Sequence, residues 1–173
     1  MNLLITLLQI IIPSAIVFAT AYFLVKNFLD NESKKRMSEI KKTNQELITP
    51  VRLQAYERVV LFLERITPNS LVMRIHSSGM SARALHGELL KTIRLEFEHN
   101  VAQQVYISNK AWAEVKNSKE EIIKLINVCS TKVDGVATGA QLAEKIIEVS
   151  SQIPKLPTQI AIENLKKEIA LAF

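Results

Sequence analysis

The chain contains little of the material from which turns, disulfides and catalytic sites are usually built. Its 173 residues include four glycines, five prolines, one cysteine and three histidines. A single cysteine cannot form an intrachain disulfide, which fits a reducing compartment such as the cytoplasm. The shortage of glycine and proline, together with few β-branched alternations, excludes a sheet-rich fold and predicts an all-α fold.

Motifs of catalysis and phosphate binding are also missing. The sequence has no G-x-S-x-G, Walker or G-x-G-x-x-G motif, and it contains only two aspartates. Glu96 and His99 have the Glu-x-x-His spacing of di-iron bundles, but such a site needs a second pair and two further carboxylates. His76 and His86 have no glutamate three residues before them. We therefore predict that the protein is not an enzyme and holds neither a metal nor a cofactor.

The longest uncharged stretch lies at the N-terminus, where no charged side chain precedes Lys26. From Leu3 to Val25 the chain is almost entirely apolar, and as a helix it would reach about 35 Å at about 1.5 Å per residue. The hydrocarbon core of a bilayer is about 30 Å thick. Residues 1–25 are therefore predicted to form a transmembrane anchor. A cleaved signal peptide would have a basic start and a shorter apolar core, so a retained anchor is favoured.

Basic residues crowd the C-terminal side of this predicted span. The segment 26–42 contains six of them against three acids, whereas the N-terminal side offers only the α-amino group. Positive charge beside a span stays on the cytoplasmic side of the membrane. The sequence therefore predicts an N-terminus outside the membrane and a C-terminal domain in the cytoplasm.

One face of the predicted span carries polar and kinking residues. At 100° per residue, five such positions fall within about 60° of one another. They are Asn2, Thr6, Gln9, Pro13 and Thr20. Amide and hydroxyl groups in hydrocarbon gain roughly 0.5–2 kcal/mol from partners on another helix, so we interpret this face as a contact with a partner's transmembrane helix. The alternative is a lone span whose threonine hydroxyls bond to its own backbone.

Residues 26–48 are predicted to continue as a charged juxtamembrane helix, followed by a helical domain over residues 49–173. The juxtamembrane helix has an apolar stripe with a, d, a, d spacing, although two heptads are too few to define a coiled coil. The stripe consists of Met37, Ile40, Asn44 and Leu47. Dimerisation through this stripe and docking of the stripe on the chain's own domain both remain open.

Capping residues predict where the helices of residues 49–173 begin and end. Capping boxes formed by Ser118 with Glu121 and by Thr138 with Gln141 predict helix starts near 119 and 139. The other predicted boundaries are a start at Thr49-Pro50, an end at Thr67-Pro68, a helix from Ser81 to about Ile107, a cap at Asn109 and a last helix over 158–172. Cys129 shares a helical stripe with Ile122 and Ile126, which predicts a buried structural thiol.

Two sets of residues are candidates for contacts with partners. The first set contains large amphipathic and amide side chains, which make directional interfaces. It comprises Tyr56, Glu96, His99, Asn100, Gln103, Gln104, Tyr106 and Trp112. The alternative is that these side chains pack and cap within the bundle. The second set could meet phosphate groups, although no nucleic-acid-binding motif accompanies it. It comprises Arg52, Arg58, Arg65, Arg74, Arg83 and Arg94.

Several local patterns resemble those of a known family. The run LQAYERVVLFLERITP at 53–68, EFEHN at 96–100, QQVY at 103–106 and AW at 111–112 resemble an uncharacterised family of small bacterial membrane proteins, a domain of unknown function. The resemblance implies one N-terminal span followed by a helical cytoplasmic domain, and it implies no catalytic residue or ligand.

The apolar span, the basic residues that follow it and the family resemblance together predict a single-pass protein of the bacterial inner (cytoplasmic) membrane. We expect an accessory or scaffold subunit that binds an inner-membrane protein complex through protein–protein interaction, with the lipid bilayer around its anchor. One alternative is a membrane tether for RNA or ribosomes that acts through the arginine residues. The other is a homo-oligomeric structural stalk, such as a homodimer.

Overall fold

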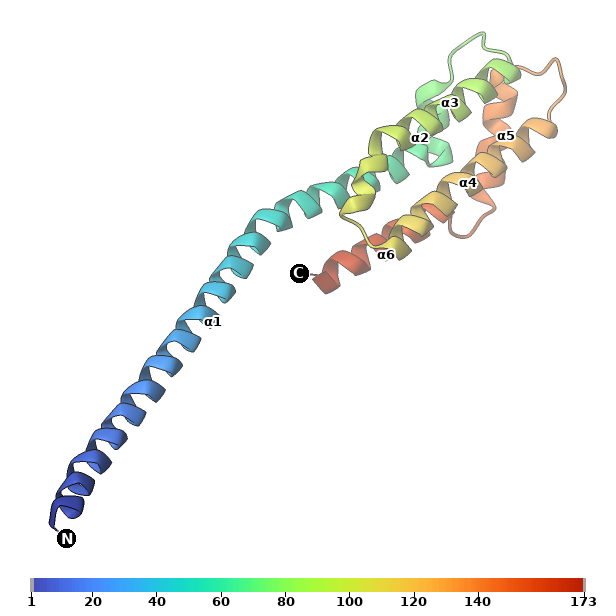
Figure 1. The fold of residues 1–173 in the computed structure, drawn as a ribbon. Coiled ribbons are helices and arrows are strands. Elements are labelled where there is room, and N and C mark those ends of the chain that lie inside the picture. Colours follow the sequence, from blue (N-terminus) through green and yellow to red (C-terminus); the bar gives the residue numbers. More distant parts are fainter. Residues whose placement is uncertain (1, 173) are drawn as a thin grey trace. The chain divides into compact units, whose positions relative to one another are not determined.

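The structure, a computed structural model, describes the backbone of residues 2–172 and the side chains of residues 11–43 and 45–171. Over these residues it contains six α-helices, one 3-10 helix and no β-strand (Figure 1). The helices are α1 (Asn2–Ile66), α2 (Pro68–Ile75), α3 (Ala82–Asn100), η1 (Val101–Val105), α4 (Asn109–Thr131), α5 (Gly139–Ser151) and α6 (Pro157–Ala172). The prediction of an all-α fold is confirmed.

The chain divides into two compact units, Met1–Thr49 and Pro50–Phe173, which we call the N-terminal unit and the helical domain. Helix α1 contributes to both units, so the prediction that a new helix begins at Thr49-Pro50 is wrong. A proline inside a helix removes one backbone hydrogen bond and costs about 3 kcal/mol. The helical turns on both sides offset that cost here. The predicted boundary between an anchor at 1–25 and a juxtamembrane helix at 26–48 also falls inside α1 and stays a prediction.

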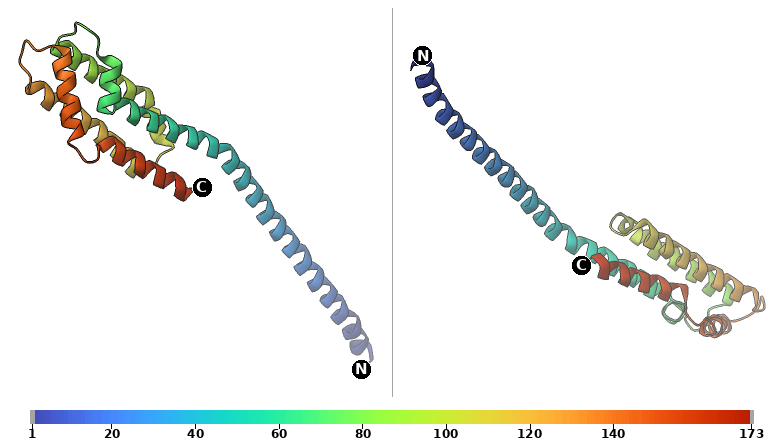
Figure 2. Two further views of the ribbon diagram at one scale, coloured as in Figure 1. Left: turned by 180° about the vertical axis from the view of Figure 1, so that it is seen from behind. Right: turned by 90° about the horizontal axis from the view of Figure 1, so that it is seen from below.

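The helical domain is built around one core to which every one of its α-helices contributes. Helix α4 packs against α3, α5 and α6, while α5 packs against α2 and α3. Figure 2 shows α6 running beside α4. Fully buried members of the core include Phe62, Leu71, Leu89, Ile126, Ile146 and Leu165. Cys129 lies among them as predicted, and burial raises the pKa of its thiol.

Several helix ends follow the capping signals in the sequence. Thr138 and Gln141 form a complete capping box, and α5 begins at Gly139. The Ser81 hydroxyl accepts a hydrogen bond from the Ala84 amide at 3.2 Å and caps α3. Helix α1 ends at Ile66, one residue before Thr67-Pro68. These parts of the prediction are confirmed because each signal acts on a neighbouring backbone group.

Three further predicted boundaries are wrong. Helix α3 ends at Asn100 instead of near 107, where the chain tightens into η1 and the Asn100 side-chain amide donates to the Glu96 carbonyl at 2.8 Å. The cap of α4 is Ser108 rather than Asn109, with the Ser108 hydroxyl accepting from the Ala111 amide at 3.2 Å. Ser118 starts no helix: it is buried within α4, where its hydroxyl donates to the Pro157 carbonyl at 2.9 Å.

The starts of α3 and α5 are joined by an isolated antiparallel bridge between Ser81 and Thr138. The Ala82 amide donates to the Ala137 carbonyl at 3.0 Å, and the Gly139 amide donates to the Met80 carbonyl at 2.7 Å. A Cβ atom on Gly139 would lie 3.0 Å from that same carbonyl oxygen, so the close approach favours glycine there. Two helix starts that are distant in sequence are thereby held together.

Candidate membrane span and interaction surfaces

Residues 11–25 of α1 are apolar on all sides and exposed at every position. Phe18, for example, leaves 74% of its surface uncovered. Apolar helices of this kind are stable either in the core of a protein or in a bilayer. Helix α1 is long and apolar enough to cross a membrane, and none of its most apolar window is buried within the described residues. The structure thus marks α1 as a candidate span by length and composition.

The predicted polar face of the span is described only in part. The side chains of Asn2, Thr6 and Gln9 lie outside the described residues. Pro13 lies within α1, which continues past it. The Thr20 hydroxyl donates to the Ile16 carbonyl at 2.8 Å. Thr20 therefore satisfies its hydroxyl on its own helix, as the alternative interpretation expected, and needs no partner for it.

The segment that follows the candidate span exposes each of its described side chains between residues 26 and 48. Met37, Ile40 and Leu47 are more than half exposed, while the side chain of Asn44 lies outside the described residues. Charged residues of both signs lie around these apolar positions, with one ion pair of 3.5 Å between Arg36 Nε and Glu32 Oε1. An apolar stripe on a charged helix is therefore present and open.

Tyr56 is not part of a contact surface, because its side chain is fully buried in the helical domain. Its hydroxyl donates to Oε1 of Glu168. The same carboxylate accepts from the Ser108 amide at 3.1 Å and from the Ser108 hydroxyl at 2.5 Å. Burial raises the pKa of Glu168, but the hydrogen bonds from Ser108 and Tyr56 outweigh it and hold the pKa below its usual value. This carboxylate joins α1, α6 and the start of α4.

Trp112 is also buried, with 6% of its surface exposed. Its ring stacks on Phe97 with the centroids 5.6 Å apart, and Phe97 in turn lies 5.9 Å from Phe62. The ammonium group of Lys119 lies 4.3 Å from the centre of the Phe97 ring. The interpretation of Tyr56 and Trp112 as contact residues is wrong, and the packing alternative holds for both, because residues far away in sequence cover them.

Glu96 also acts within the domain. Its carboxylate lies 2.9 Å from a guanidinium nitrogen of Arg65 and 3.7 Å from one of Arg74. The three residues come from α3, α1 and α2, and the Glu96 side chain is only 16% exposed. Among residues 11–43 and 45–171, no three His, Cys, Asp or Glu side chains come close enough to hold a metal ion. Glu96 is thus a link between three helices.

The remaining candidates lie on the last two residues of α3, on η1 and on Tyr106 directly after it, and we call this part of the chain the η1 surface. Three of the predicted residues on it are exposed and two are half-buried. Val101 and Val105 join them, with Val105 77% exposed, and no residue of η1 is buried. The η1 surface consists of His99, Asn100, Val101, Gln103, Gln104, Val105 and Tyr106. The sequence did not predict Val101 and Val105 as surface residues. A helix continuing to 107 would place Val101 on the buried stripe.

The six arginines do not gather on one face. Arg65 and Arg74 meet at Glu96. Arg52 lies close enough to Glu168 for its charge to act on that carboxylate. The other three, Arg58, Arg83 and Arg94, are exposed on α1 and α3. The structure therefore brings together two of the six.

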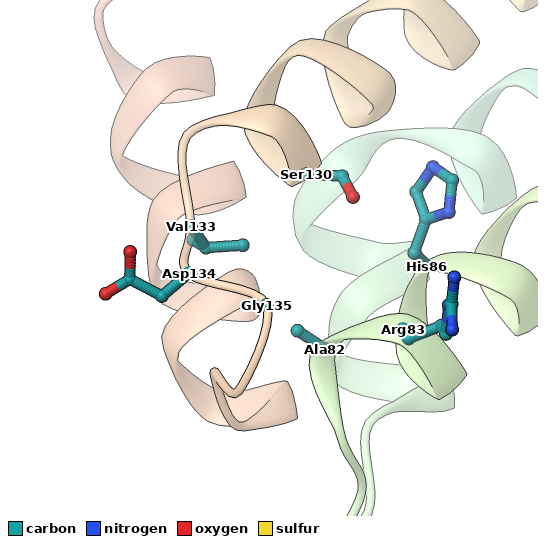
Figure 3. Close-up of a pocket in the computed structure, with 7 residues that line it drawn as sticks. All are labelled: Ala82, Arg83, His86, Ser130, Val133, Asp134 and Gly135. Atoms are coloured by element: carbon teal, nitrogen blue, oxygen red, sulfur yellow. The ribbon is translucent and has the colours of Figure 1, made fainter.

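Arg83 borders a shallow hollow of about 360 Å³ between the start of α3 and the end of α4. Figure 3 shows His86 beside Arg83, with the Asp134 carboxylate directed away from both. The His86 Nε2 donates a hydrogen bond to the Asn127 side-chain oxygen at 2.8 Å. The charged groups around this hollow do not converge on a common point, so it offers no assembled reaction centre.

Comparison with known proteins gives one match. The model of a family described as a family of unknown function (DUF7935) matches residues 2–172. No curated protein and no solved structure matches the chain. The match covers both units and ascribes no activity to either.

Proposed function

The chain belongs to a family of unknown function, DUF7935, and we propose that it is a single-pass membrane protein that acts as an accessory or scaffold subunit of an inner-membrane protein complex. Residues 1–25 anchor it, and its helical domain lies in the cytoplasm and binds another protein. The exposed apolar surface of residues 11–25 is the observation that carries this proposal.

The free energy that would be gained by burying this apolar surface supports a membrane anchor. Burial of a large apolar side chain contributes about 1.5–3 kcal/mol, and this segment exposes such side chains on every face. Since none of that stabilisation comes from the described part of the chain, an apolar surrounding has to provide it. A bilayer is the surrounding that also suits the charge pattern, because the first basic residues come directly after Val25.

Binding, rather than a reaction, is the task that best suits the helical domain. Two of its half-buried charged groups, Glu96 and Glu168, are used within the fold. Its η1 surface combines exposed valines with amide side chains and a tyrosine, a mixture typical of protein interfaces. We propose the η1 surface as the domain's contact with the partner complex.

A pair of charges in the span tests the anchor. Val17→Arg with Ala21→Arg places two guanidinium groups on one face of the span, at a cost of about 5–7 kcal/mol for insertion. We expect wild-type protein to float with membranes after alkaline extraction and this variant to be lost from them. The matched control, Ser33→Arg with Met37→Arg, adds the same charges at the same spacing outside the span and keeps membrane retention. Release of the wild-type protein by alkali would contradict the anchor.

A labelling experiment tests orientation. In a Cys129→Ala background, Ser38→Cys is expected to resist a membrane-impermeant maleimide until the membrane is opened. Asn2→Cys is expected to react from outside the intact cell. The reverse pattern would place the helical domain outside.

Co-purification tests the partner. Tagged full-length protein is purified in gentle detergent at native expression and compared with a Thr6→Leu, Gln9→Leu variant. A reproducible membrane complex that the variant loses supports a subunit held through the polar face. Recovery of the protein alone, or with ribosomal components at low salt only, would contradict the subunit and favour the homo-oligomer or the RNA tether.

A further inference from the structure

The part of α1 that follows the proposed anchor carries an apolar stripe that the described structure leaves uncovered. Its members Met37, Ile40, Leu47 and Ile48 are 52–66% exposed. At 100° per residue they lie within about 100° of one another, the width of a stripe that normally packs against a second element. We call these four residues the juxtamembrane stripe.

A lipid surface does not fit the juxtamembrane stripe. Helix α1 continues without interruption from residue 11 to residue 48, so the residues after the anchor extend along its axis. With Val25 at the edge of the hydrocarbon, Met37 lies about 18 Å and Ile48 about 35 Å further along, at about 1.5 Å per residue. The headgroup layer on each side is only about 5–8 Å thick. The stripe therefore lies in water, beyond the lipid.

A second copy of the chain fits the stripe poorly because the flanks of the stripe are basic. With Met37 at position a, Lys34 and Lys41 occupy e positions and Arg36 occupies g, and all three are exposed. A parallel pair of copies sets g of one helix against e of the other, and thus Arg36 against Lys41. An antiparallel pair sets e against e, and thus lysine against lysine. Each arrangement joins like charges.

Acids on the same helix do not remove this bias. Glu32, Glu39 and Glu46 occupy c positions, behind Arg36 and away from the lysine edge. Asp30, one heptad before Met37, occupies an a position, where a parallel pair of copies would again join like charges. Glu32 pairs with Arg36 at 3.5 Å, but the Arg36 side chain remains 75% exposed. On the other edge, a shallow hollow of about 460 Å³ lies between Lys34, Met37 and Lys41. An incoming side chain can fill it while its neighbours meet the two ammonium groups.

We propose that the juxtamembrane stripe binds an amphipathic helix of a different protein, one whose apolar seam is flanked by glutamate or aspartate. This inference deepens the proposed function, on which it rests for the position of the stripe outside the lipid. Exposed ion pairs contribute only about 0.2–1 kcal/mol each, so the apolar seam supplies the affinity and the charges select the partner.

Two designed peptides test the proposal. Both are 21-residue helices with Ile at a, Leu at d and one Asn placed opposite Asn44; one carries Glu and the other Lys at every e and g position. Their binding is measured by fluorescence anisotropy with full-length protein in nanodiscs of zwitterionic phosphatidylcholine. We expect the Glu peptide to bind at least tenfold more tightly than the Lys peptide in low salt, with a smaller ratio in high salt.

Matched variants separate charge from apolar contact. Lys34→Glu, Arg36→Glu and Lys41→Glu together are expected to reverse the preference between the peptides. Ile40→Asp with Leu47→Asp is expected to abolish binding of both. Glu57→Gln with Arg58→Gln, at exposed positions on the part of α1 inside the helical domain, serves as a control and leaves binding unchanged.

Equal affinity for the two peptides, or binding of neither, would overturn the proposal. A preference that the triple charge reversal leaves unaltered would overturn it as well. Rapid disulfide formation between copies carrying Met37→Cys and Cys129→Ala, without peptide binding, would identify a second copy as the occupant instead. Flotation reports on the anchor and the peptide titration on the stripe, so a failure of the proposed function and a failure of this inference are seen separately.

Discussion

The N-terminal unit and the helical domain treat the same kinds of side chain in opposite ways. Helix α1 passes through both, and its apolar residues are exposed at Ile16 and Phe18 but fully buried at Val59 and Leu63. The secondary structure is the same in the two places, so the surroundings alone make the difference. Where the chain folds on itself it supplies its own apolar environment, whereas the apolar side chains of residues 11–25 stay uncovered by the described part of the chain.

The largest expected difference in stability between the two units comes from placing a carboxylate in each. Ile126→Asp buries an unpaired charge in the core and is expected to cost about 5 kcal/mol or more, comparable to the whole stability of a domain. Ile40→Asp, at an exposed position, is expected to change the unfolding of the domain by less than about 0.5 kcal/mol. The single tryptophan lies in the core, so its fluorescence during urea titration reports domain unfolding. Similar midpoints for the two variants would contradict the assigned core.

Loss of an aromatic side chain is the next largest effect. Trp112→Ala removes a buried ring that stacks on Phe97 and is expected to destabilise the domain by about 3–5 kcal/mol. Phe28→Ala, in the N-terminal unit, is expected to leave the domain's urea midpoint unchanged by circular dichroism. A Trp112→Ala protein with unaltered stability and lost partner binding would return Trp112 to the interface.

The buried carboxylate gives a smaller, pH-dependent effect. Glu168→Gln weakens three hydrogen bonds, and we expect a loss of about 1–3 kcal/mol at pH 7. Because the pKa of Glu168 is lowered by folding, its contribution is present above the unfolded value of about 4.5 and is lost as the pH falls through the folded pKa. Urea midpoints of wild type and variant should therefore converge in acid.

The matched control for this pH effect is Glu32→Gln in the N-terminal unit, where the carboxylate forms an exposed ion pair. Such pairs contribute about 0–1 kcal/mol, and none of it reaches the core of the domain. A difference between Glu168→Gln and wild type that persists unchanged down to the lowest pH at which the domain stays folded would exclude the assigned hydrogen bonds as its source.

The smallest effect concerns two glycines of the domain itself. Gly87 lies within α3 with open space where a Cβ would be, so Gly87→Ala is expected to stabilise the domain by about 0.5–1 kcal/mol. In Gly139→Ala the added methyl group would crowd the Met80 carbonyl oxygen, so this variant is expected to destabilise the domain. Thermal unfolding followed by tryptophan fluorescence measures the expected gain in stability of Gly87→Ala and the expected loss in Gly139→Ala. A loss of stability in Gly87→Ala would show that this face of α3 is covered.

Sequence signals predicted the fold well where the interacting groups are close together in the chain. The capping box of Thr138 joins residues three apart, and the matching helix start was found. Ser118 has the same pattern, but its hydroxyl bonds to a carbonyl 39 residues away and the helix runs through it. The local sequence does not distinguish the Ser118 pattern from the Thr138 capping box. Packing of α4 against α6 decides that Ser118 lies inside a helix instead of starting one.

The candidate contact residues failed for the same reason. Tyrosine and tryptophan are frequent in interfaces and in cores alike, and the residue that satisfies the Tyr56 hydroxyl lies 112 positions later. Amide-rich residues 99–106 remained on the surface because the helix ended early at Asn100. Periodicity therefore predicted the buried stripes of the domain, whereas it did not show that α3 ends at Asn100 and that the chain continues as the exposed η1.

The bridge between Ser81 and Thr138 also suits the molecule to protein engineering. It fixes the two helix starts independently of the loop that connects α4 to α5, in which Val136 is 95% exposed. Lengthening a flexible loop twofold costs only about 0.6 kcal/mol in closure entropy. An epitope or a small fluorescent reporter inserted between Gly135 and Val136 would therefore leave the core intact, and it would give an internal handle that spares both chain ends.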